Sequence, residues 1–250
     1  MESEVQLHAQ LRRLKLSGIL DTLEMRVLEG QQNQLDYKTF FSLLLQDEIE
    51  ARQARKTARL LEQARFGQKQ TLEGFDFTLA PALNATLIRE LATMTFIMRG
   101  EGVILTGPPG TGKTHLAKAF GHSACRRGYT VRFHKFHELF AALTRADLAG
   151  ELEALLNALI KCDLLILDDF AFRKIDQTSS EYLYTIVDGR YSSRSLILTS
   201  NRALGDWLSI FPDPVIGGAI LDRLTHQAHQ IQLKGESVRK KMALKSQNQT

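Results

Sequence analysis

The sequence predicts an α/β protein in which a parallel sheet of five strands follows an all-helical N-terminal part. Two observations predict the sheet. Short apolar runs alternate with helical segments after residue 100, and the motif Gly-Pro-Pro-Gly-Thr-Gly-Lys-Thr (107–114) lies between a strand and a helix. A third observation separates the N-terminal part from the sheet: apolar residues recur at helical spacing through residues 1–70. We therefore expect a helical interaction domain at 1–70 and an α/β domain at 71–250.

Three helices are expected in the N-terminal part. Leucines at helical spacing define the first, and the second follows Ser17-Gly18 and is expected to end at Gly30. The third starts near Asp36 and continues into a basic stretch, whose members are Arg52, Arg55, Lys56, Arg59, Arg65 and Lys69. Two interpretations of this stretch are open: solvated charge on a long helix, or a surface that contacts phosphates.

A connector at 71–81 leads to a predicted helix at 81–98, which delivers the chain to the first strand. The connector carries Phe75 and Phe77, which could flank an adenine base or fill the junction between the two parts. The remaining elements follow in order. We expect strands at 102–106, 129–133, within 163–169, at 195–199 and at 229–233, and helices from the motif to Gly128, at 135–145 and at 151–160.

The composition and the lack of long apolar runs indicate a globular protein rather than a secreted or membrane-spanning one. The chain of 250 residues is 44% hydrophobic and 24% charged, which is typical of a globular protein with a sizeable core. Its net charge of +4 permits an acidic polymer as partner without requiring one. Cys125 and Cys162 lack metal-ligand spacing and are expected to be buried and reduced. No signal peptide or membrane-spanning run is evident, so we expect a cytoplasmic protein.

The motif at 107–114 has the residue types that a phosphate-binding loop needs. Glycines let successive backbone N–H groups point at one spot, and the helix that follows directs its own N–H groups and dipole there. Lys113 is expected to reach the β- and γ-phosphates and Thr114 to bind Mg²⁺. A simple turn between strand and helix is the alternative. The residues expected to contact the nucleotide are Gly107, Pro108, Pro109, Gly110, Thr111, Gly112, Lys113 and Thr114.

Three polar residues follow later strands and are expected at the same edge of the sheet. Asp168 and Asp169 end the third strand, and Asn201 follows the fourth. Ligands of parallel sheets bind beyond the carboxyl ends of the strands, so these side chains converge on the γ-phosphate if the strands are neighbours. Asp168 would then hold Mg²⁺, Asp169 would polarise the attacking water, and Asn201 would hydrogen-bond that water or the phosphate.

These residues resemble the IstB/DnaC-like AAA+ ATPases, and among them the IstB transposition helpers more than the helicase loaders. The resemblance covers nearly the whole chain. The segments that carry it are 14–19, 72–77, 107–115, 124–129, 163–169, 198–201, Leu-Asp-Arg-Leu (221–224) and Gly-Glu-Ser-Val-Arg (235–239).

The resemblance implies a sheet order of 5-1-4-3-2, with ATP and Mg²⁺ as cofactors. It also implies that Arg223 is an arginine finger that reaches the ATP of a neighbouring subunit. Two departures from the family matter. Asp169 stands where the family often has the longer Glu, so either the attacking water must sit closer to the carboxylate or turnover is slow. Too few residues follow Arg223 for a complete helical lid, although Arg239 could replace part of it.

The function implied by the resemblance is that of a helper ATPase for DNA transposition. It would oligomerise on duplex DNA with ATP, select the target and deliver it to a transposase of the same element, with little sequence preference. Candidate DNA contacts are Lys135, Arg173 and Lys174, which are expected past strand ends and away from the nucleotide; solvated surface charge is the alternative for each. A replicative helicase loader of the DnaC type and a P-loop kinase of a small molecule are the competing hypotheses.

Overall fold

The computed structural model describes residues 2–68, 70–75, 83–235 and 237. The chain divides into two compact units, Met1–Arg59 and Leu60–Thr250. The predicted boundary near residue 70 is not tested by this division and stays a prediction. Phe77 and Arg239, for which the sequence suggested roles, lie outside the described residues.

Three helices build the N-terminal unit: α1 (Glu2–Arg13), α2 (Ser17–Gln32) and α3 (Tyr37–Ala64), whose last residues belong to the second unit. The prediction that Gly30 ends α2 is wrong. The helix continues to Gln32, because the chain turns only at Asn33, whose N–H still bonds to the Glu29 carbonyl. Asp36 was expected to start α3, and its carboxylate accepts hydrogen bonds from the N–H groups of Lys38 and Thr39.

Buried carboxylates on α3 hold α2 in place. Glu48 is 4% exposed and accepts the Gly18 N–H at 2.6 Å, which satisfies a donor in the first turn of α2. Its other oxygen accepts from Arg52 at 2.6 Å and lies 3.5 Å from Arg55. Two members of the basic stretch are therefore part of a structural ion-pair network.

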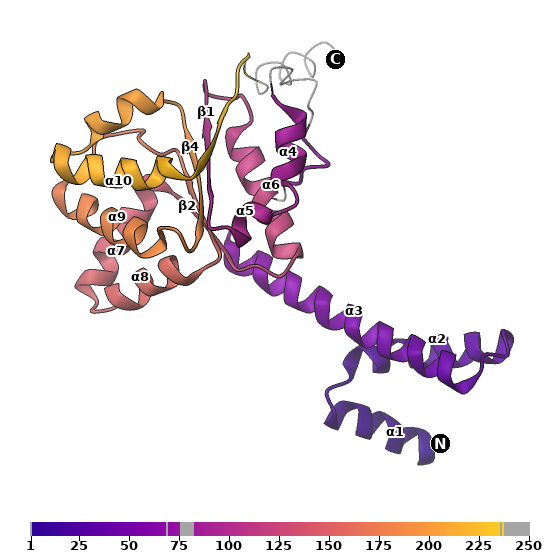
Figure 1. The fold of residues 1–250 in the computed structure, drawn as a ribbon. Helices are drawn as coiled ribbons and strands as arrows, with labels where there is room; N and C mark the ends of the chain where they lie inside the picture. The colour runs from indigo at the N-terminus through magenta and orange to yellow at the C-terminus, as the bar shows by residue number, and fades with distance from the viewer. Residues whose placement is uncertain (1, 69, 76–82, 236, 238–250) are drawn as a thin grey trace, which may run out of the picture. The chain divides into compact units, whose positions relative to one another are not determined.

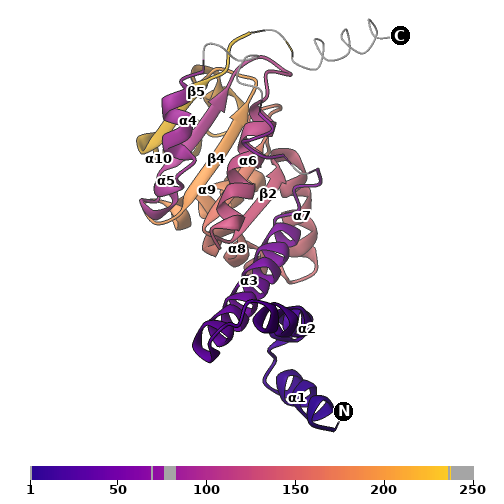
Figure 2. The same ribbon diagram turned by 90° about the vertical axis from the view of Figure 1, so that its right-hand side faces the viewer.

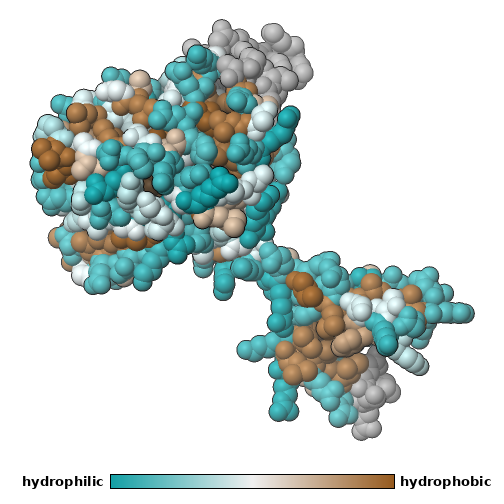
Figure 3. Space-filling view, viewed as in Figure 1, coloured by the Kyte–Doolittle hydropathy of each residue, from teal (hydrophilic) through white to brown (hydrophobic). Residues whose placement is uncertain are grey.

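The core of the N-terminal unit is small, and much apolar surface stays exposed. Leu11, Ile19, Leu23 and Leu44 form its buried cluster. Large apolar side chains recur every fourth residue along one exposed stripe of α3, namely Tyr37, Phe41, Leu45 and Ile49. Figure 3 shows apolar residues gathered on a face of this unit.

The second unit is built on a five-stranded parallel sheet in the order β2-β3-β4-β1-β5, which confirms the predicted order. The strands are β1 (Gly102–Thr106), β2 (Val131–Lys135), β3 (Leu164–Asp168), β4 (Ser195–Ser200) and β5 (Ala228–Gln232). β2 begins two residues later than predicted. Tyr129 still donates its N–H to Ala124 at the end of α6, and Thr130 donates to the Asp163 carboxylate at 2.9 Å.

Helices cover both faces of the sheet (Figures 1 and 2). One face carries α4 (Ala85–Leu91), α5 (Thr95–Met98) and α6 (Lys113–Arg126). The other carries α7 (Phe136–Leu148), α8 (Leu152–Lys161), α9 (Gln177–Arg190) and α10 (Pro214–His226), with the 3-10 helix η2 (Leu204–Ile210). In the described part of the chain, no helix has the length and apolarity that crossing a membrane requires.

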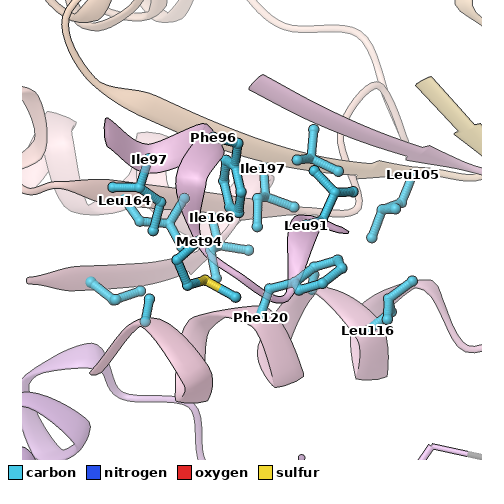
Figure 4. Packing of buried hydrophobic residues seen from close by; sticks show 14 of the residues in the cluster. Leu91, Met94, Phe96, Ile97, Leu105, Leu116, Phe120, Leu164, Ile166 and Ile197 are labelled. Atoms are coloured by element: carbon cyan, nitrogen blue, oxygen red, sulfur yellow. The ribbon is translucent and has the colours of Figure 1, made fainter. Parts of the chain in front are cut away.

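Strand residues point alternately to two hydrophobic clusters, one under each helical layer. On β1, Leu105 joins the cluster with α4–α6, whereas Ile104 joins the cluster with α7–α10. Figure 4 shows the first cluster, in which Phe120 of α6 and Phe96 of α5 lie close to Ile197 of β4. Both cysteines are buried as expected, and burial raises the pKa of the Cys125 thiol to about 12.

The prediction of one helix at 81–98 is wrong. A turn separates α4 from α5, and Met94 adopts a left-handed conformation with φ of +64°. Met94 is only 1% exposed, and Figure 4 shows it pointing into the cluster between α6 and the sheet. Burial of this apolar side chain offsets the cost of the left-handed backbone and of the interrupted helix.

Candidate nucleotide-binding site

The predicted phosphate loop lies between β1 and α6, and its glycines have backbone conformations that other residues rarely adopt. Gly107 has φ of +145° and Gly112 φ of +98°. A Cβ on Gly107 would lie 2.2 Å from the Leu233 carbonyl oxygen, and one on Gly112 would lie 3.0 Å from the Phe75 ring. Conformation therefore favours glycine at both positions, and at Gly107 the lack of space requires it. The Gly107 N–H bonds to the Ser200 carbonyl at 3.2 Å, which attaches the loop to β4.

Lys113 begins α6 and its side chain folds back over the loop. It is 5% exposed, and its ammonium donates to the Gly107 and Pro108 carbonyls at 2.8 Å each. A buried cation thus lies beside the N–H groups at the start of a helix, where the helix dipole also favours an anion. This arrangement fits the phosphates of a nucleotide.

Asp168 ends β3, and the structure brings it to the loop as the sequence predicted. It is 3% exposed, and its Oδ1 accepts the Thr114 hydroxyl at 2.8 Å and the Thr199 hydroxyl at 2.5 Å. Thr114 and Asp168 offer the hard oxygen atoms that Mg²⁺ prefers. Among the described residues, no cluster of three or more His, Cys, Asp or Glu could hold a metal. Phosphate and water oxygens would have to complete the coordination of Mg²⁺.

Asp169 follows in a left-handed conformation, with φ of +58°, and is half-buried. Burial, and then the neighbouring Asp168 charge, raise the pKa of its carboxyl, while Lys113, His137 and Lys135 act in the opposite direction. The raised pKa makes this carboxylate a better proton acceptor than an ordinary aspartate, as a group that activates water requires.

Asn201 directly follows β4, which lies between β1 and β3 in the sheet. The carboxyl ends of these three strands therefore adjoin, as the predicted convergence of the loop, the two aspartates and Asn201 requires. The Asn201 side chain is exposed. Its contact with a water or a phosphate stays a prediction.

Arg223 lies at the opposite edge of the sheet. It is on α10, and it lines a hollow together with Gly102 and Leu196, which stand at the amino ends of β1 and β4. Its Nε lies 3.0 Å from the Asp188 carboxylate, and its other nitrogens donate to the Ala219 carbonyl and the Tyr184 hydroxyl. The length of β1 thus separates Arg223 from the phosphate loop of its own chain.

The three candidate DNA contacts lie at the carboxyl edge. Lys135 is in register with Asp168, and its ammonium pairs with Glu138 at 3.1 Å. Lys135 ends β2, which β3 and β4 separate from β1 and the phosphate loop, so the expectation that Lys135 lies away from the nucleotide stays a prediction. Arg173 and Lys174 are exposed in the loop that joins Asp169 to α9.

Two features of the site were missed or left open by sequence reasoning. The buried Thr199 hydroxyl contacts both aspartates, but a threonine inside an apolar strand gives no signal of such a role. Phe75 was given two roles, and the structure places its ring against Gly112 and edge-on to His115, with centroids 5.5 Å apart. It therefore packs at the start of α6, beside the loop.

The strand order, the phosphate loop after β1 and the acidic pair after β3 define a P-loop protein with the AAA+ fold. Comparison with known sequences makes the assignment more specific. The sequence model of the family described as "IstB-like ATP binding protein" matches residues 9–246, and the chain belongs to this family.

Similar proteins come from several bacteria. The chain is 40% identical over 230 residues to a protein of Mycobacterium tuberculosis named as a candidate ATP-binding protein in an insertion sequence, covering 92% of each chain. It is 38% identical over 233 residues to the corresponding protein of insertion sequence IS5376 from Geobacillus stearothermophilus, covering 93% of each. The IS21 protein of Pseudomonas aeruginosa is 38% identical, covering 94% of this chain and 89% of the relative.

Solved structures share the fold. DnaA from Aquifex aeolicus bound to AMPPCP has a TM-score of 0.59 at 22% identity, covering 74% of this chain and 57% of DnaA. This chain therefore spans little more than half of that protein. The DnaC helicase loader has a TM-score of 0.51 at 22% identity, covering 68% of this chain and 97% of the loader. At these identities the likeness concerns the fold alone.

Proposed function

We propose that this protein is a helper ATPase for DNA transposition. It oligomerises on duplex DNA with ATP, selects target DNA and delivers it to a transposase, and hydrolysis remodels or releases the assembly. Family membership supports this proposal, because the relatives are named for insertion sequences. A DnaA structure described as bound to AMPPCP and single-stranded DNA, at 25% identity, supports a link between nucleotide and nucleic acid in this fold.

Nucleotide binding uses the loop and the first turn of α6. Lys113 exchanges its bonds to the Gly107 and Pro108 carbonyls for bonds to the β- and γ-phosphates. The loop N–H groups bind the same phosphates. Thr114 and Asp168 would hold Mg²⁺ from one side, since the hydroxyl and the carboxylate already meet there. When bound, Mg²⁺ neutralises charge that develops on the phosphates.

Hydrolysis needs a group that orients and activates water. Asp169 stands beside Asp168, and its raised pKa suits proton acceptance. Asn201 hydrogen-bonds the attacking water or the γ-phosphate from the end of β4. Because aspartate is one methylene shorter than the glutamate common in the family, its water must approach more closely, and we expect slow turnover.

The position of Arg223 is the observation that best supports an oligomer. A guanidinium at the amino edge of the sheet cannot stabilise phosphate charge at the carboxyl edge of the same chain. The Arg223 of each copy would therefore contact the nucleotide bound to a neighbouring copy, as arginine fingers do in trans. Its present contacts, with Asp188 and Tyr184, would be exchanged for phosphate when two copies meet.

DNA binding would use exposed cations of the oligomer. Arg173 and Lys174 are the stronger candidates, because they lie on one exposed loop next to the acidic pair. Lys135 is already paired with Glu138, which weakens its case. Contacts of this kind bind phosphates without reading bases, so affinity should fall steeply with salt and depend little on sequence.

The test is to measure assembly and DNA binding together. Analytical ultracentrifugation and electron microscopy of the protein on duplex DNA, with a non-hydrolysable ATP analogue, should reveal an oligomer that ADP does not support. A monomer that hydrolyses ATP at full rate without DNA would contradict the proposal and favour a small-molecule kinase. Parallel binding assays with purified transposase and replicative helicase decide between a transposition helper and a helicase loader.

A further inference from the structure

Thr199, on β4, is the residue through which the two aspartates are connected. Its side chain is fully buried at 0% exposure. The hydroxyl donates to Asp168 Oδ1 at 2.5 Å and accepts the backbone N–H of Asp169 at 3.0 Å. A hydroxyl has one donor and two acceptor positions, so these two bonds are compatible. Because the site is buried, water cannot easily replace either bond.

The backbone of Thr199 holds the same turn. Its carbonyl accepts the Phe170 N–H at 2.7 Å. The turn is unusual, because Asp169 and Ala171 both have positive φ, at +58° and +61°. Such conformations cost free energy in residues other than glycine and persist where surrounding contacts impose them. The direction of the Asp169 side chain follows from this turn, so it depends on Thr199.

Thr199 is also close to the phosphate loop. It is in register with Leu105, the penultimate residue of β1, and the next residue, Ser200, accepts the Gly107 N–H at 3.2 Å. Asp168 Oδ1 meanwhile receives hydroxyl donors from two sides, Thr114 at 2.8 Å and Thr199 at 2.5 Å. Two donors from different elements restrict the orientation of this carboxylate more than one donor does.

We propose that Thr199 is a positioning residue for ATP hydrolysis: its hydroxyl orients the Asp168 carboxylate toward the metal position and holds Asp169 in the turn that directs it at the attacking water. This inference rests on the proposed ATPase function. It assigns to a buried β4 hydroxyl a role that the phosphate loop, the acidic pair and Asn201 do not fulfil.

Three variants separate positioning from packing. Thr199→Val keeps the shape but removes the hydroxyl, Thr199→Ser keeps the hydroxyl but removes the methyl, and Ser195→Ala removes another fully buried β4 hydroxyl, at the amino edge. For Thr199→Val we expect kcat for ATP to fall about tenfold to a hundredfold, the usual loss when a partner of a metal ligand is removed. KM should stay within about threefold, because the loop still binds the phosphates.

A readout without turnover is the affinity for a fluorescent non-hydrolysable ATP analogue, measured with Mg²⁺ and with EDTA. Thr199→Val should lose most of the gain in affinity that Mg²⁺ gives the wild type, whereas Thr199→Ser should keep that gain and a near-normal kcat. Ser195→Ala should lower the unfolding temperature without changing either quantity.

Equal losses in the Val and Ser variants would overturn the proposal, because the methyl group would then matter rather than the hydroxyl. Unchanged kcat and unchanged Mg²⁺ dependence in Thr199→Val would also overturn it, as would complete loss of analogue binding. If the wild type hydrolyses no ATP with duplex DNA, the proposed function fails on its own. The Mg²⁺-dependent affinity then still decides whether the Thr199 hydroxyl orients Asp168 toward the metal position.

Discussion

The Thr114 hydroxyl donates a 2.8 Å hydrogen bond to the Asp168 carboxylate, although the two residues lie 54 positions apart in the chain. Thr114 belongs to the first turn of α6 and Asp168 ends β3, so the bond connects the phosphate loop to the acidic pair. If Mg²⁺ binds between the phosphates and the protein, the Thr114 hydroxyl and the Asp168 carboxylate would each contact the metal, either in place of this hydrogen bond or in addition to it. The bond thus places the two side chains proposed to hold Mg²⁺ next to each other.

The Lys113→Ala variant should lose nucleotide binding. The ammonium of Lys113 is the buried cation at the loop, and removing it leaves phosphate charge facing the loop carbonyls without compensation. We expect the affinity for a fluorescent ATP analogue to fall by at least about a hundredfold, as loss of a charge-assisted contact worth about 3 kcal/mol predicts. Lys161→Ala, at an exposed position at the end of α8, is the control. Retained affinity in Lys113→Ala would exclude the loop as the binding site.

Asp169→Asn should bind ATP, stop hydrolysis and hold the protein on DNA. Only the ionised carboxylate accepts a proton, so wild-type kcat/KM, which reports the free enzyme, should rise with pH through the raised pKa of Asp169 and then level off. The variant should lack this rise. Burial disfavours the charge, so wild-type stability falls as pH increases through the pKa, and the neutral amide should not lower the unfolding temperature near pH 7. Normal turnover in Asp169→Asn would remove Asp169 from the mechanism.

A mixing experiment tests whether Arg223 acts on a neighbour. Arg223→Ala should bind ATP and lose turnover, because the guanidinium that we propose stabilises the transition state is missing. The Lys113→Ala variant should not bind nucleotide, but it still has Arg223. Mixed at equal concentrations, the two inactive variants should regain part of the wild-type rate, measured as phosphate release on duplex DNA. No recovery at any ratio, although both variants still co-assemble, would count against a shared site.

Salt dependence tests the DNA contacts. If Arg173 and Lys174 each neutralise one phosphate, replacing both by Ala should flatten the slope of log affinity against log salt by about 2, and should weaken binding equally on unrelated duplexes. Arg99→Ala, at the amino edge with a side chain 64% exposed, controls for loss of one surface charge. A slope unchanged in the double variant would assign both residues to solvated surface.

The elements that sequence reasoning found are those whose signals are local. The loop motif, the apolar strands and the strand-end aspartates need no knowledge of distant residues, and the structure has them where expected, except that β2 begins two residues later. Features that depend on tertiary contacts were missed. The break at Met94 follows from burial under α6, and the role of Thr199 follows from β4 lying next to β3. The resemblance implied that β4 lies next to β3, but no residue pattern shows that the Thr199 hydroxyl contacts the aspartates or that Met94 is buried.

The burial of Arg190 is another feature that the sequence does not indicate, since arginine at the end of a helix is normally solvated. It is 2% exposed, and its guanidinium donates to the carbonyls of Leu159, Cys162 and Ser195. These bonds attach the end of α9 to the end of α8 and to the start of β4. Burial lowers the pKa of Arg190, so these carbonyl contacts have to compensate for the cost of the buried charge.

Arg190→Leu should therefore lower the free energy of unfolding by about 3 to 5 kcal/mol, because it leaves several buried carbonyls without donors. Trp207 is the only tryptophan and is fully buried in the same unit, so its fluorescence during urea unfolding follows the relevant transition. Arg194→Ala breaks the more exposed pair with Asp163 and should cost no more than about 1 kcal/mol. If the two variants lose equal stability, the buried carbonyl contacts of Arg190 contribute no more than a surface ion pair, and α9 is held to the sheet by its apolar face alone.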